Sequence, residues 1–149
     1  MDVNDFKSQL NNRGAISFVP SGNSMWPFLK NGKQSVIVVN KTERLNVYDV
    51  AMYYRDNGDA VLHRVVGVTN AGYVMQGDSH RTTEPIKEEQ VFGVMQGFFK
   101  GKTLIESTDK KYKRKVKKYY ERKKLRIFRI IFFQLRCRIK NRLKKIFCK

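Results

Sequence analysis

The chain has 149 residues, enough for one ordinary domain with its own hydrophobic core and an appendage, but not for a multidomain enzyme. Its formal net charge of +18 is confined to the C-terminal part: residues 1–109 hold 12 basic and 12 acidic residues, whereas residues 110–149 hold 19 basic residues and the single acid Glu121. This asymmetry predicts a domain over residues 1–109 and a basic tail over residues 110–149 with a polyanionic partner. The polar N-terminus predicts no secretory signal, and no apolar run is long enough to span a membrane.

The elements expected in residues 1–109 are mainly strands. Residues 2–12 are expected to form a short helix that Gly14 ends. Segments rich in β-branched and aromatic residues, separated by turn residues, are expected to be strands: residues 15–19, 36–39, 47–54, 60–68, 73–75, 90–96 and 98–105. The last two are expected to pair around Gly97. The pattern predicts a mainly β fold, either a coiled antiparallel sheet or a partly open barrel.

The tail is expected to be a basic amphipathic helix. Between residues 125 and 147 apolar side chains recur at three- and four-residue steps, and Arg and Lys occupy the other faces. This pattern is typical of a helix in the interface of a membrane, so the expected partner is an anionic membrane surface bound through residues 125–147. Packing on the β domain or on another protein is an alternative. Nucleic acid is a less favoured partner, because the apolar face is wide.

Ser24, in the loop between Gly22 and Pro27, is a candidate nucleophile, and His63, at the end of an apolar run, is a candidate base. A serine hydroxyl needs a base to take its proton, and imidazole titrates in the suitable range. Each residue also has a simpler interpretation, as a turn serine bonded to its own backbone or as a histidine of the core. No cluster of His and Cys has metal-ligand spacing, so neither a metal nor another cofactor is expected.

Five short segments around this pair occur in a characteristic order. They are Gly22-x-Ser24-Met25-x-Pro27-x-Leu29, Tyr48-Asp49-Val50, Leu62-His63-Arg64-Val65-Val66-Gly67, Gln76-Gly77-Asp78-Ser79 and Gln90-Val91-Phe92-Gly93-Val94. Together they resemble the boxes of the type I signal peptidases and of the related LexA-type self-cleaving repressors, over roughly residues 16–97. The second segment corresponds to Gly-Asp-Val of that family, and the fourth to Lys-Gly-Asp-Asn.

The resemblance implies a serine endopeptidase with the signal peptidase fold, in which Ser24 is the nucleophile and His63 the general base. Most bacterial members have a lysine where His63 stands, so the chain is similar to the histidine-type peptidases of the endoplasmic reticulum, archaea and some Gram-positive bacteria. A histidine base needs an acid to hold its tautomer. The candidates are Asp78, in the Gly-Asp box, and Glu84, where the histidine branch has a second aspartate. The alternative role of Asp78 is structural, as a residue that fixes its loop through backbone hydrogen bonds.

The resemblance also indicates the residues around the nucleophile. The backbone N–H of Ser24 is the natural oxyanion donor, and the hydroxyl of Ser21 is a second candidate. Many signal peptidases have a serine at the position of Gly22, and the family's acid after the next glycine is replaced here by Lys33. Met25 is expected to form an apolar wall for the substrate; contact with the membrane and a place in the core are the alternatives.

The implied substrate is a signal, leader or precursor peptide with small side chains just before the cut. The family's N-terminal membrane anchor is missing from the sequence, so we expect peripheral association with the cytoplasmic face of a membrane. The segment before residue 15 is too short for the DNA-binding domain of a LexA-type repressor. The alternative function is a non-catalytic or regulatory binding module that keeps the peptidase fold and uses its tail on membrane or nucleic acid.

Overall fold

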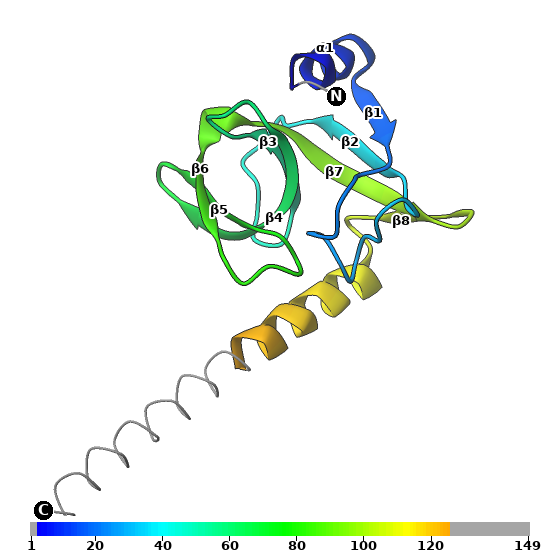
Figure 1. The fold of residues 1–149 in the computed structure, drawn as a ribbon. Coiled ribbons are helices and arrows are strands. Elements are labelled where there is room, and N and C mark those ends of the chain that lie inside the picture. The colour runs from blue at the N-terminus through cyan, green and yellow to red at the C-terminus, as the bar shows by residue number, and fades with distance from the viewer. Residues whose placement is uncertain (1–2, 126–149) are drawn as a thin grey trace, which may run out of the picture. The chain divides into compact units, whose positions relative to one another are not determined.

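The computed structural model describes residues 3–125 (Figure 1). The chain divides into two compact units, residues 1–113 and 114–149, and the first contains all the strands. A helix covers residues 110–125 and begins after Asp109, whose carboxylate accepts the N–H of Tyr112 at 2.7 Å as an N-cap. Within residues 3–125 no helix is both long and apolar enough to cross a bilayer. Apart from residue 125, the expected membrane-binding stretch 125–147 lies outside the described residues.

The N-terminal helix α1 spans Val3–Arg13 and confirms the helix expected there. It buries Val3, Phe6 and Leu10, which follow one another at helical spacing along one face. Gly14 ends it with φ of 70°, and the N–H of Gly14 donates to the carbonyl of Leu10 at 2.8 Å. The ring of Phe6 packs against that of Phe18, with ring centres 5.1 Å apart, which fixes α1 beside the first strand (Figure 1).

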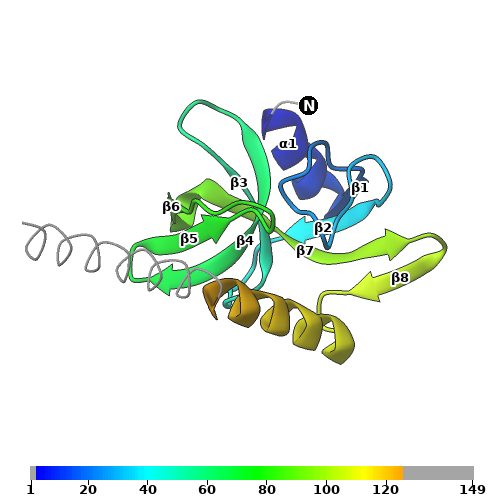
Figure 2. The same ribbon diagram turned by 60° about the horizontal axis from the view of Figure 1, so that its bottom comes forward.

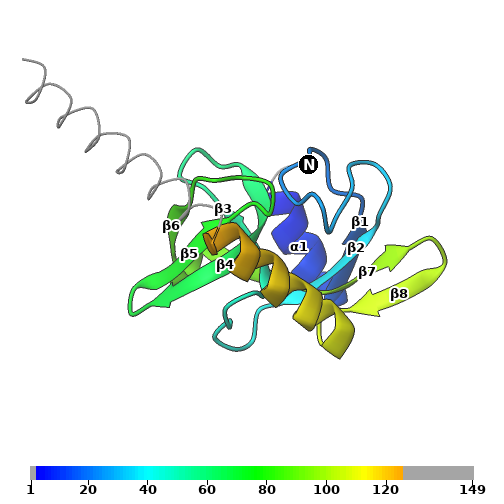
Figure 3. The ribbon, with the colours of Figure 1, turned by 90° about the horizontal axis from the view of Figure 1, so that it is seen from below.

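Eight strands form one antiparallel sheet, as the mainly β composition predicted. They are β1 (Ala15–Phe18), β2 (Val36–Asn40), β3 (Val50–Tyr54), β4 (Ala60–Thr69), β5 (Gly72–Gln76), β6 (Glu84–Lys87), β7 (Val91–Lys100) and β8 (Thr103–Glu106). The strand order is β1-β2-β7-β3-β4-β5-β6, and β8 pairs with the end of β7 that β3 leaves free. The β7–β8 hairpin therefore projects away from β5 and β6 (Figure 2, Figure 3).

The segment from β3 to β6 curls so strongly that its first and last strands approach each other. Gln90, in the short 3-10 helix η1 (Glu88–Gln90) after β6, donates to the carbonyl of Tyr54 in β3 at 3.1 Å. No strand pairing joins β3 to β6 in the described part of the chain, so the sheet is not closed into a barrel. Apolar side chains fill the inside of the curl: Leu45, Ala51, Tyr53, Val65, Tyr73, Met75, Ile86 and Val91. Burial of these side chains stabilises the curl.

Two expectations about the end of the sheet were wrong or incomplete. Gly97 is not a turn, because β7 runs through it and the chain reverses at Gly101, where φ is 61°. Gly97 is needed for a different reason: a Cβ there would lie 2.8 Å from the carbonyl oxygen of Ile105 in the paired strand. Strand β6 was not expected from the sequence. Its Pro85 is tolerated because β6 is an edge strand.

Arg64 of β4 forms a fully buried ion pair with Asp78 on the face of β4 opposite His63. Its Nε and Nη2 donate to the two carboxylate oxygens at 2.7 and 2.8 Å, and both side chains have 0% exposure. Its remaining N–H groups reach the carbonyl of Tyr48 at 2.8 Å and the hydroxyl of Tyr112 at 3.1 Å. Burial alone would lower the pKa of Arg64, but the Asp78 carboxylate outweighs it and raises the pKa, so the guanidinium stays charged.

We expect Asp78→Ala to lower the free energy of unfolding by about 3–5 kcal/mol, because it leaves the buried Arg64 charge without its partner. Glu89→Gln is the matched control, because Glu89 forms an exposed ion pair with Lys87 at 3.9 Å. This substitution should lower the free energy of unfolding by less than about 0.5 kcal/mol. Urea unfolding of both variants measures the difference. A loss below about 1 kcal/mol for Asp78→Ala would show that the ion pair does not hold this face together.

Candidate active site

The loop that contains Ser24 is shaped by hydrogen bonds of its own backbone between residues 23 and 29. The N–H of Trp26 donates to the carbonyl of Asn23 at 3.1 Å, and that of Leu29 to the carbonyl of Met25 at 2.9 Å. Met25 and Leu29 are buried, with 4% and 2% exposure, and anchor the loop to the core. Ser24 stays partly exposed above them. The sequence therefore presents a serine at a tight turn whose neighbours cannot move freely.

The turn after β5 holds the Ser24 loop from the other side. Ser79 donates its backbone N–H to the carbonyl of Ser24 at 2.9 Å, and its hydroxyl lies 3.1 Å from the same oxygen and 3.0 Å from the carbonyl of Asn23. Gly77 lets the two segments approach, because a Cβ there would lie 2.9 Å from the Ser24 carbonyl oxygen. The Ser24 N–H makes no hydrogen bond to any residue between 3 and 125, so it remains available as an oxyanion donor.

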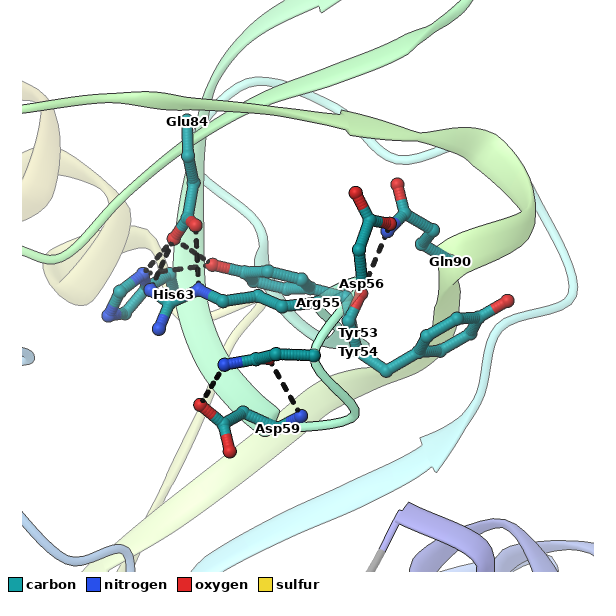
Figure 4. Close-up of polar contacts among 9 residues, drawn as sticks. Tyr53, Tyr54, Arg55, Asp56, Asp59, His63, Glu84 and Gln90 are labelled. Carbon is teal, nitrogen blue, oxygen red and sulfur yellow. Dashed lines mark hydrogen bonds and ion pairs between the residues drawn. The ribbon is translucent and has the colours of Figure 1, made fainter.

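His63 lies on the inner face of β4, directly opposite Ala51 of β3, and is only 4% exposed. Its Nδ1 is 3.1 Å from Oε1 of Glu84 and 3.0 Å from the hydroxyl of Tyr53 (Figure 4). Tyr53 reaches it because residues two apart on a strand share a face, and a diagonal cross-strand neighbour is within reach of a long side chain. Glu84 reaches it because the curl brings β6 over this face.

Glu84 is the centre of this network. Arg55 donates two parallel hydrogen bonds to its carboxylate, from Nε to Oε2 at 2.8 Å and from Nη2 to Oε1 at 2.9 Å, and the Tyr53 hydroxyl donates to Oε1 (Figure 4). The Arg55 hydrogen bonds and charge, aided by those from Tyr53 and His63 and opposed by partial burial, lower the pKa of Glu84 from 4.5 to about 2. Glu84 is therefore ionised at any pH where the protein would work.

These contacts determine which nitrogen of His63 carries the proton. An ionised Glu84 can only accept hydrogen bonds. Tyr53 is neutral, because burial, supported by the Glu84 carboxylate, raises its pKa, and its one hydroxyl proton goes to Glu84. The proton between His63 and these oxygens must therefore be on Nδ1. Nε2 is left with a free lone pair and, among residues 3–125, no hydrogen-bond partner. Burial lowers the pKa of His63 below 6.5, and Glu84 partly opposes this.

Ser24 and His63 line the same cleft, whose volume is about 680 Å³. Ser21 and Met25, the other residues expected near the nucleophile, line it as well. Among the residues described, the Ser24 hydroxyl and His63 face one cleft without a hydrogen bond between them. His80 also lines it and packs its ring against that of His63, with centres 5.5 Å apart at 84°.

The structure separates the two acids that the sequence left as alternatives. Glu84 contacts His63, whereas Asp78 is buried against Arg64 on the other face of β4. Lys33 is exposed and does not line the cleft, and no group of His, Cys, Asp and Glu in residues 3–125 could hold a metal ion.

Sequence reasoning missed Tyr53, Arg55 and Ser79. Tyr53 and Arg55 are two and four residues after Ala51, which lies opposite His63, so their side chains point to the same face. Correct pairing of β3 with β4 would therefore have placed them on the His63 face. Nothing in the sequence indicates that the Ser79 hydroxyl turns towards the Ser24 loop rather than towards solvent.

We expect the imidazole of His63 to titrate below its ordinary pKa of 6.5, and Glu84→Gln to lower that pKa further, because burial remains while the stabilising carboxylate is lost. The chain has two histidines, so a proton NMR titration gives two imidazole signals, which His80→Gln assigns. Glu89 is an exposed acid after β6, and Glu89→Gln should leave the midpoint of His63 unchanged. A higher midpoint in Glu84→Gln would contradict the network described here.

Neither a comparison with models of protein families nor a search of curated proteins finds a match. The residues of the cleft and the five sequence segments therefore carry the functional proposal.

Proposed function

We propose that this chain is a serine endopeptidase of the signal peptidase type, in which Ser24, His63 and Glu84 act as nucleophile, base and orienting acid. The observation that carries the proposal is that Ser24 and His63 line one cleft while Glu84 holds the opposite nitrogen of the imidazole. That arrangement leaves the basic nitrogen of His63 free and supports the imidazolium that proton transfer creates. A histidine that served only to fill the core would not need a hydrogen bond from Nδ1 to an ionised acid, so the Glu84 contact favours the role of a base.

The reaction follows from these positions. His63 Nε2 takes the proton from the Ser24 hydroxyl as its oxygen attacks the peptide carbonyl, and the negative oxygen of the tetrahedral intermediate accepts a hydrogen bond from the Ser24 N–H. His63 then gives the proton to the leaving amine, which breaks the peptide bond and leaves an acyl ester on Ser24. A water molecule, deprotonated by His63, hydrolyses the ester. Glu84 stays ionised throughout and Nδ1 keeps its proton.

The backbone at Tyr48 supports the assignment to this family. Tyr48 stands where the corresponding box of the signal peptidases has glycine, and its φ of 82° lies in the left-handed region that favours glycine. Its carbonyl accepts a hydrogen bond from Arg64, and its N–H donates to the carbonyl of Val65 at 2.8 Å. The resemblance implies a backbone conformation at this position that favours glycine. Tyr48 adopts that conformation although it is not glycine.

The proposed activity predicts a covalent adduct with a fluorophosphonate probe, detected by intact mass. Ser24→Ala should abolish the adduct, and His63→Ala should slow its formation by about 100-fold or more, because the general base is lost. Ser107→Ala is the control, since Ser107 lies after β8 and does not line the cleft. Wild-type protein that forms no adduct, or an adduct that persists in Ser24→Ala, would favour the non-catalytic binding module instead.

The proposed substrate is a signal, leader or precursor peptide that reaches the site near a membrane. The chain would bind the anionic lipids of the cytoplasmic face peripherally, through the basic amphipathic stretch over residues 125–147. Support comes from the described part of the C-terminal helix, where the exposed basic residues include Lys113, Lys117 and Lys124. Each basic side chain near an anionic leaflet adds about 1 kcal/mol of attraction.

Membrane binding is tested by flotation of the full chain with vesicles of phosphatidylcholine, with and without phosphatidylserine. Lys113→Gln combined with Lys117→Gln removes about 2 kcal/mol of attraction and should weaken binding to the anionic vesicles by about 30-fold. Lys100→Gln combined with Lys102→Gln removes the same charge from the β7–β8 hairpin and should have little effect. Retention of DNA at a salt concentration that releases all lipid would contradict the membrane proposal and favour nucleic acid.

A further inference from the structure

The cleft that contains Ser24 and His63 has an apolar floor and a polar rim. The floor is formed by buried side chains of α1, the Ser24 loop, β3 and β4: Phe6, Met25, Leu29, Met52 and Leu62, each with 8% exposure or less. The rim carries exposed polar groups, among them Ser21, Asn31 and Asp59. A floor of this kind fits an apolar side chain, while the rim can bind the backbone that carries it.

The cleft has room for a large side chain. Its volume of about 680 Å³ lies within the range of about 300–1,000 Å³ that ligand sites commonly have, whereas alanine would offer a single methyl group to the floor. Two of the floor residues, Met25 and Met52, have flexible thioether side chains that adapt to irregular apolar shapes. Phe18, half-buried beside Phe6, extends the apolar surface at the α1 end.

We infer that this cleft binds a peptide through a bulky apolar side chain, of leucine or phenylalanine type, seated on the floor between α1 and the β3–β4 hairpin. The inference depends on the proposed peptidase function and names the substrate class for the same site. It differs from the preference for small side chains just before the cut that the family resemblance implies. The α1 end of the cleft, which Phe6 and Phe18 form, is therefore a specificity subsite of this chain.

The test measures binding without chemistry, in the full chain carrying Ser24→Ala and ¹³C-methyl-labelled methionine. The probes are the blocked peptides acetyl-Ala-X-Ala-amide, in which X is Leu, Phe, Ala or Asp. Met25 and Met52 line the cleft, whereas Met75 and Met95 are buried elsewhere and serve as internal controls. We expect the Leu and Phe peptides to shift the signals of the first two methionines only, and to bind at least tenfold more tightly than the Ala or Asp peptides.

Two phenylalanine variants locate the subsite. Phe18→Ala should weaken binding of the Phe peptide at least fivefold, because it removes one apolar wall. Phe92→Ala, at a half-buried position of β7 that does not line the cleft, should leave binding unchanged. Equal affinity for the Ala and Leu peptides, shifts at Met75 or Met95, or no binding at millimolar peptide would overturn the inference. Because Ser24→Ala cannot be acylated, such a failure is distinct from a failure of the fluorophosphonate reaction.

Discussion

The hydrogen bonds of Glu84 join two strands that no backbone pairing connects. Glu84 begins β6, the last strand of the sheet order. Tyr53 belongs to the end of β3, three strands away along the curl, and Arg55 directly follows that strand. The apolar core stabilises the curl, but these polar contacts set where its two ends meet. Since the same carboxylate touches His63, the position at which the sheet stops curling also determines the orientation of the imidazole.

Neighbouring residues of β4 use the two faces of the strand for separate purposes. His63 faces the inside of the curl and the cleft, and Arg64 faces the opposite side and is fully buried. Each takes one acid: Glu84 from β6 and Asp78 from the turn after β5. The two carboxylates therefore do not compete for the imidazole. The ion pair of Arg64 and Asp78 supports one face of β4. On the other face, Nε2 of His63 has no hydrogen-bond partner among residues 3–125.

Local sequence patterns predicted much of the fold and the pair that lines the cleft. Turn residues and β-branched runs located α1 and most strands. The sequence did not show whether Asp78 or Glu84 contacts His63, because that depends on how far the sheet curls, and curling is a property of the whole core. Gly97 was misassigned for a related reason: glycine serves both turns and close strand approach, and only the partner strand distinguishes them.

The turn at residues 77–79 links the core to the cleft through two consecutive side chains. Asp78 enters the buried ion pair, and Ser79 holds the carbonyls of the Ser24 loop. Because this turn is only three residues long, a movement that breaks one of these contacts also breaks the other. Heating would then disrupt the ion pair and the Ser24 loop in the same transition of the unit formed by residues 1–113, so a partly unfolded form that keeps only one of them would not accumulate.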